Sequence, residues 1–149
     1  MADTLKVTIT EALTLNSAEQ GGTTNLSITG INHAYKRIVT VPTSEILLYD
    51  THDTNVAGST FDDDNIRYVR VTHTGTSNVI VLRVKNADND EFAYKLNAGE
   101  SFLLYKHEST MNAVAAGTLD IGTGWHDVTS FKATAPDGAC TCEIFIASV

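Results

Sequence analysis

The chain is poor in proline, tryptophan and cysteine, and it has no long apolar run. Its 149 residues include 2 Pro, 1 Trp and 2 Cys. No stretch approaches the roughly 18 apolar residues of a membrane-spanning helix. The first residues, M-A-D-T-L-K, lack the basic and apolar regions of a signal peptide. We therefore expect a chain that is made and folded in a cytoplasm and has no membrane partner.

Basic residues are also scarce. Lys and Arg together number 10 against 18 Asp and Glu, which gives a formal net charge of −8 and a pI near 4.9. An acidic surface disfavours binding to nucleic acids and to anionic membranes. Nucleic acid is therefore not expected as a partner either.

The two cysteines lie in the short run Cys140-Thr141-Cys142. On a strand both would point to the same face, and a disulfide between residues i and i+2 would be strained. A metal site would need a second pair of ligands, and none has suitable spacing. The pattern favours two small side chains in or near a core strand.

Motifs of common enzyme classes are missing. The sequence has no G-x-S-x-G motif, no phosphate-binding glycine loop followed by Lys-Ser/Thr, and no H-E-x-x-H motif. Its five histidines are at least nineteen residues apart, so the H-x-H pair of a metal-binding cupin is absent. His73 and His126 are expected to have surface or packing roles. The sequence thus favours a protein that is not an enzyme and holds no cofactor.

What the chain does contain is threonine, 21 times, in short alternating segments separated by turn residues. This length fits one domain. The alternation predicts an all-β fold, an antiparallel β-sandwich of the jelly-roll type, with residues 1–24 as an N-terminal strand or extended arm. The expected strands cover residues 5–10, 26–31, 35–41, 45–49, 66–74, 79–85, 92–96, 101–105, 128–134 and 140–147.

Three pairs of these segments are separated by tight turns and are expected to form hairpins: 66–85, 91–105 and 128–147. In the second of them Gly99 supplies the turn. Its residues Phe92, Leu96, Phe102 and Leu104 are predicted to face the core. A short helix is expected within Ser109–Gly117.

The only ionic cluster that suggests a ligand is Asp62-Asp63-Asp64, in a polar loop that also holds Asp53 and Asn55. Crowded carboxylates attract Ca²⁺, but the spacing of an EF-hand is not met. Solvated loop acids are the simpler interpretation, and calcium is kept as a hypothesis.

Candidate partner-binding residues are Leu5 and Lys6 in the arm, Arg67 and Arg83 on strands expected to be adjacent, and Trp125. The two arginines belong either to a solvated sheet face or to a charged face that docks on an acidic partner. Trp125 suits an interface anchor, because Trp is enriched in binding hot spots. It would equally suit the open end of a sandwich.

Three groups of segments, taken in order, resemble small virion structural proteins of tailed phages, especially cyanophages and marine phages. They are T-I-T-E, I-T-G-I-N and Y-K-R-I-V-T-V-P-T-S-E (residues 8–45), I-R-Y-V-R-V-T (66–72), and L-N-A-G-E-S-F-L-L (96–104) with the tail segments 127–135 and 143–147. The resemblance covers most of the chain but consists of strand and turn patterns.

The resemblance implies a jelly-roll capsid cement or decoration protein. Such a protein is often a homotrimer that sits on the capsid exterior and binds neighbouring subunits of the major capsid protein. It transfers no catalytic residue. Two alternatives stay open: a lectin-like carbohydrate-binding module of a tail or fibre, and, more remotely, a cupin-like enzyme.

Overall fold

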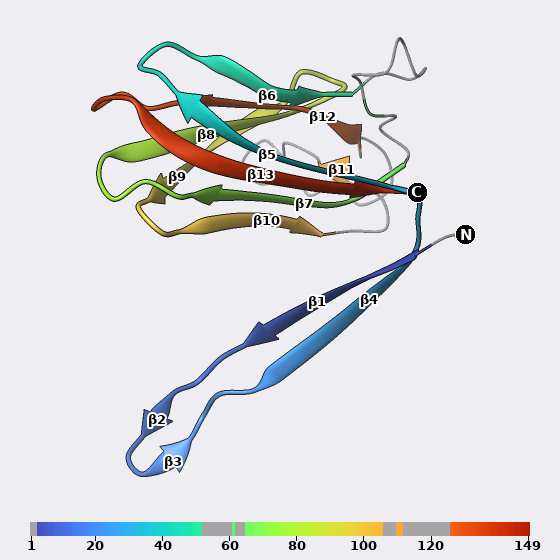
Figure 1. Ribbon diagram of the computed structural model, residues 1–149, viewed down its shortest axis with the longest axis vertical. Coiled ribbons are helices and arrows are strands. Elements are labelled where there is room, and N and C mark those ends of the chain that lie inside the picture. Colours follow the sequence, from blue (N-terminus) through green and yellow to red (C-terminus); the bar gives the residue numbers. More distant parts are fainter. Residues whose placement is uncertain (1–2, 52–60, 62–64, 106–109, 112–125) are drawn as a thin grey trace, which may run out of the picture.

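The computed structural model describes residues 3–51, 61, 65–105, 110–111 and 126–149. Over these ranges the chain forms β-strands joined by turns, and no α-helix. None of the described residues belongs to a helix long and apolar enough to cross a membrane. The molecule has two parts, a two-layered body and a hairpin that projects from one end of it (Figure 1).

The body is an antiparallel sandwich of two sheets. Sheet I contains, in order, β10 (Ser101–Tyr105), β7 (Ile66–His73), β13 (Cys140–Ser148) and β5 (His33–Val41). Sheet II contains, in order, β6 (Ile46–Asp50), β12 (His126–Thr134), β8 (Val79–Asn86) and β9 (Glu91–Asn97). The short strand β11 (Thr110–Met111) also pairs with β12.

Four turns carry the chain between the sheets, from β5 to β6, β7 to β8, β9 to β10 and β12 to β13, and the chain also changes sheet between β6 and β7 and between β10 and β11. All four turns lie at the same end of the body, on the left of Figure 1. This connectivity is that of a jelly roll, in which the two sheets share the strands of a folded-over antiparallel ribbon. The expected all-β sandwich, its jelly-roll topology and its N-terminal arm are confirmed.

The three predicted hairpins are wrong, because each of these turns joins strands of different sheets. β7 pairs with β10 and β13, whereas β8 pairs with β12 and β9. The turns themselves are real: Gly99 has φ 83°, and the Asn78 amide donates to the Gly138 carbonyl at 3.2 Å, which ties two crossovers together. Turn chemistry shows that the chain reverses direction. Turn residues do not determine whether the next strand pairs with the preceding strand or crosses over the core to the other sheet.

The core fills the space between the sheets. Phe131 is completely buried and stacks on Tyr49, with ring centroids 4.9 Å apart. Of the four predicted core residues, Leu96 is fully buried, and Phe102 and Leu104 are partly buried against the same cluster. Phe92 also faces the core side, since its ring contacts Phe102, but its side chain is 40% exposed and is not buried. β9 and β10 are the edge strands on one side of the sandwich, so an inward side chain there stays partly open to solvent.

The cysteine prediction is confirmed, because Cys140 and Cys142 are both buried and free. Burial raises the pKa of the Cys142 thiol to about 11. The helix expected within 109–117 is wrong at Thr110 and Met111, which form a strand; the other residues of that segment lie outside the described ranges. These two residues pair with β12, a strand that is distant in the sequence, and no local sequence pattern predicts this pairing.

The projecting hairpin, called the arm below, comprises residues 3–31. Its stem pairs β1 (Asp3–Thr10) with β4 (Thr23–Ile31), and its tip pairs β2 (Thr14–Leu15) with β3 (Ala18–Glu19). Asn16 and Ser17 both have positive φ, 51° and 64°, as a two-residue hairpin turn of type I′ requires. The arm is therefore longer than the expected 1–24 segment and folds back on itself.

Candidate docking surfaces

The root of the arm is anchored on the outer face of sheet I. Ile28 and Ile31 form a buried cluster with Tyr68 and Ala147 of the body. Leu5 and Val7 pack against this cluster from the other strand of the arm. Leu5, a candidate partner-binding residue, thus helps to hold the arm to its own body.

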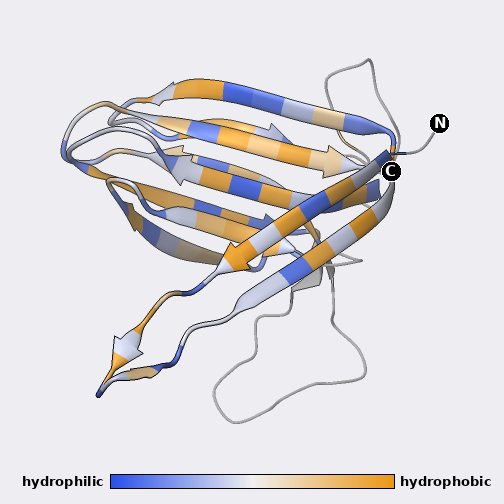
Figure 2. Cartoon of the chain, turned by 60° about the horizontal axis from the view of Figure 1, so that its bottom comes forward, coloured by the Kyte–Doolittle hydropathy of each residue, from blue (hydrophilic) through white to orange (hydrophobic). Residues whose placement is uncertain are grey.

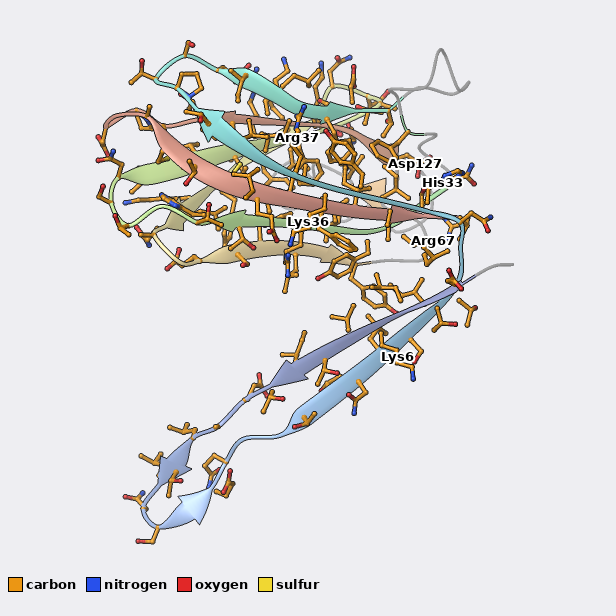
Figure 3. The ribbon with its side chains drawn as sticks, viewed as in Figure 1. Lys6, His33, Lys36, Arg37, Arg67 and Asp127 are labelled. Carbon is orange, nitrogen blue, oxygen red and sulfur yellow. The ribbon has the colours of Figure 1, made fainter. Side chains whose placement is uncertain are left out.

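Lys6 has the opposite orientation. It alternates with Leu5 and Val7 along β1, is exposed, and points away from the body (Figure 3). Its ammonium group is therefore accessible to another molecule on the face of the arm that is turned away from the body.

Beyond the root, the arm does not pack in a cluster with any described residue of the body. No residue from Thr8 to Asn25 belongs to the root cluster. Ile9, Leu13 and Leu15 are 48%, 55% and 56% exposed. Figures 1 and 2 both show the tip standing away from the sandwich. An isolated two-stranded hairpin is at best marginally stable in water, so this segment lacks the packing that stabilises the rest of the chain.

The outer face of sheet I carries a small charge network at its centre. Glu143 of β13 accepts from Lys36 of β5 at 2.9 Å and from Arg70 of β7 on the other side. The hydrogen bond from Lys36, assisted by the Arg70 charge, holds the pKa of the Glu143 carboxyl below its usual value. Two cations share one carboxylate, so this face has a net positive centre.

Exposed apolar side chains flank that network. Ile38 pairs with Glu143 in the sheet register and is 67% exposed. Leu103 lies opposite Arg70 at the other edge, and Tyr105 lies beside Tyr68 near the arm root. No local sequence pattern predicts this face. Lys36 and Ile38 do alternate along one predicted strand, but their relation to Leu103 depends on strand order, which the sequence did not reveal.

Arg83 and Arg67 are not neighbours, contrary to expectation, because β8 belongs to sheet II and β7 to sheet I. Arg83 is engaged on sheet II by Glu45 at 2.6 Å and by Glu91 at 3.6 Å. Arg67 is partly buried near the arm root and donates to the carbonyl of Ile66 at 3.3 Å. The two side chains therefore do not form one docking face.

A shallow pocket of about 490 Å³ opens on sheet II, where the pairing of β6 with β12 shifts register between Phe131 and Lys132. Its polar lining contains both signs of charge and two hydroxyl groups: Glu45, Asp50, Lys85, Thr129, Ser130 and Lys132. Such a lining suits a neutral polar ligand better than an apolar one.

The acidic cluster and the tryptophan named from the sequence fall outside the described part of the chain. Asp62, Asp63, Asp64 and Trp125 lie outside the described ranges. Within those ranges no three His, Cys, Asp or Glu side chains gather closely enough to bind a metal ion. His73 is fully buried, and its Nδ1 accepts the Gly75 amide at 3.0 Å, so it packs the end of the core.

No protein-family model matches the chain, and no curated protein matches its sequence. The resemblance to phage virion proteins therefore stays a prediction.

Proposed function

We propose that the protein is a non-enzymatic structural protein of a tailed-phage virion, a cement or decoration protein that binds the shell of the major capsid protein and stabilises it. In this proposal it is assembled in the host cytoplasm, lies on the capsid exterior and acts as a homotrimer. The sequence resemblance and the jelly-roll fold support the proposal. The fold alone decides little, since jelly rolls serve capsids, lectins and cupin enzymes alike.

The observation that carries the proposal is the arm. The chain holds a hairpin away from its own body, and Ile9, Leu13 and Leu15 are exposed in the distal part of this hairpin. Such a hairpin is suited to bind another subunit. Subunits of large assemblies use such elements, because binding orders them and covers their apolar side chains. A freely diffusing monomer gains nothing from one.

The test uses capsids that lack the protein. The purified chain should co-sediment with expanded capsids and raise the temperature at which they rupture. A short-arm variant, in which Asn-Gly replaces residues 11–22 so that Thr10 and Thr23 flank a two-residue turn, should bind less well while keeping the body's melting temperature. Failure of the full chain both to co-sediment and to raise the rupture temperature would overturn the proposal.

The second candidate is a lectin-like module of a tail or fibre, and the pocket on sheet II favours it. Hydroxyl, carboxylate and ammonium groups in one shallow hollow provide the hydrogen-bonding partners that a sugar needs. A set of host-surface glycans, with and without calcium, should then raise the melting temperature, and Thr129→Val should reduce the shift. A glycan array with no binding would dismiss this candidate. Copy number separates the two proposals, since hundreds of copies per particle fit a coat and about a dozen fit a tail.

A further inference from the structure

The arm leaves an apolar face uncovered on the side that is turned toward the body. Strand alternation places Leu5, Val7 and Ile9 on that face. On β4, Ile28 pairs with Leu5 and Leu26 pairs with Val7. The first part of the face is covered by the root cluster. Farther out, Ile9, Leu13 and Leu15 are exposed, where the arm stands away from the sandwich (Figures 1 and 2).

The outer face of sheet I offers a surface of matching character. Ile38 and Leu103 are exposed on either side of the Lys36–Glu143–Arg70 network, and their own arm covers only the root end of this face. The arm diverges from the body (Figure 1), and Ile38 is 67% exposed and lies outside the root cluster. Both apolar surfaces thus remain open within one molecule.

The distal arm and the outer face of sheet I carry opposite charges. No lysine or arginine occurs from Val7 to Tyr35, and the distal arm carries Glu11 and Glu19. Sheet I presents Lys36, whose side chain is 61% exposed, beside Arg70, with one carboxylate between them. An acidic, apolar hairpin and a positively charged, apolar sheet face attract each other, and opposite charges guide such surfaces into register.

We infer that the distal arm of one copy packs on the outer face of sheet I of a second copy. The contact joins two different patches, the arm of one copy and the sheet I face of another. The assembly is therefore closed either when two copies exchange arms reciprocally or when several copies form a ring. This deepens the proposed function, on whose homotrimer it rests, by naming the surfaces through which copies associate, and that association requires no capsid. It assigns the distal arm and the Lys36–Arg70 face to contacts between copies, so a shortened arm weakens binding to the shell by breaking the assembly of copies, and the other surfaces of the body contact the shell.

The test is the oligomeric state of the purified full chain by sedimentation equilibrium and light scattering. The wild-type chain should contain more than one copy. The double variant Ile9→Asp/Leu15→Asp and the single variant Ile38→Asp should each raise the dissociation constant at least tenfold, about 1.4 kcal/mol. Leu47→Asp, at a 50% exposed apolar position on sheet II, is the matched control and should leave it unchanged. Thermal melting establishes that each variant is folded.

A charge exchange identifies the partners. Glu11→Lys/Glu19→Lys and Lys36→Glu should each weaken association, and mixing the two variants should restore it by pairing the altered arm with the altered face. A monomeric wild-type chain, or arm and face variants that behave like Leu47→Asp, would overturn the inference. Capsid binding by a monomeric chain would overturn this contact and the homotrimer but leave the proposed role on the shell standing, so the two failures are distinguishable.

Discussion

The body and the arm are built from the same kind of strand but differ in what covers them. In the body, alternating strands such as β8 place Ile80, Leu82 and Val84 between two sheets, where all three are fully buried. In the arm, β1 alternates equally well, yet its apolar side chains face a second layer only at the root. Apolar alternation therefore specifies a strand, and only the presence of an opposing layer turns that strand into stable structure.

The largest effect should come from opening the core of the body. Phe131 is fully buried and contacts both Tyr49 and Phe102. Phe131→Ala should lower the free energy of unfolding by about 3–5 kcal/mol, because it removes apolar contacts and leaves a cavity. Urea unfolding monitored by circular dichroism measures this loss. Phe92→Ala, at the open edge, is the control and should cost about 1 kcal/mol. Equal losses of unfolding free energy for the two variants would contradict the burial of Phe131 between the two sheets.

The root of the arm should show an intermediate effect that is confined to the arm. Ile28→Ala removes apolar contacts with Tyr68 and Ala147 at the point where the hairpin meets sheet I. We expect a local loss of about 2 kcal/mol, the low end for such a truncation because the hairpin can shift to close the gap. Amide hydrogen exchange should quicken roughly 30-fold in β1 and β4 and stay unchanged in β13. Equal acceleration in both parts would mean that arm and body unfold together.

The contrast also marks how far the sequence could predict the molecule. Strand positions follow from period-two alternation, so 140–147 was expected and Cys140–Ser148 is observed. Strand partners do not follow, because a tight turn such as the one at Gly99 is compatible with a hairpin or with an arch between sheets. The docking face depends on partners: Lys36, Glu143 and Arg70 meet only because β13 lies between β5 and β7. Likewise the exposure of Phe92 depends on β9 being an edge strand, which its own residues do not reveal.

At alkaline pH the chain should lose stability through buried tyrosine and cysteine side chains of the body, since the arm itself contains neither residue type. Burial, with a smaller contribution from Asp50, raises the pKa of Tyr49 well above its usual value near 10. The unfolded chain releases this proton above pH 10 while the folded chain retains it, so stability falls there by up to about 1.4 kcal/mol per pH unit. The buried Cys142 thiol, with a pKa of about 11, adds to the loss between pH 9 and 11.

The variant Tyr49→Phe isolates the tyrosine contribution. Between pH 8 and pH 11 it should lose about 1.4 kcal/mol less than the wild-type chain in urea unfolding. It should cost little at neutral pH, because the Tyr49 hydroxyl has no hydrogen-bond partner among the described residues. Tyr105→Phe, at an exposed position on sheet I, should follow the wild-type profile. An unchanged profile for Tyr49→Phe would mean that the hydroxyl reaches solvent.

The smallest effect should come from the distal arm. Ile9→Ala and Leu15→Ala truncate exposed side chains that contact no residue of the body cluster, so each should change the free energy of unfolding of the dilute chain by less than about 0.5 kcal/mol. Ile80→Ala, in the body, should cost about 2–5 kcal/mol under the same conditions. A cost above 1 kcal/mol in the arm that appears only as the protein concentration rises would show that a second copy covers these side chains, because association stabilises the folded state by mass action. The same cost at every concentration would show that the arm folds back on its own body, and the distinction between the two parts of the molecule would be lost.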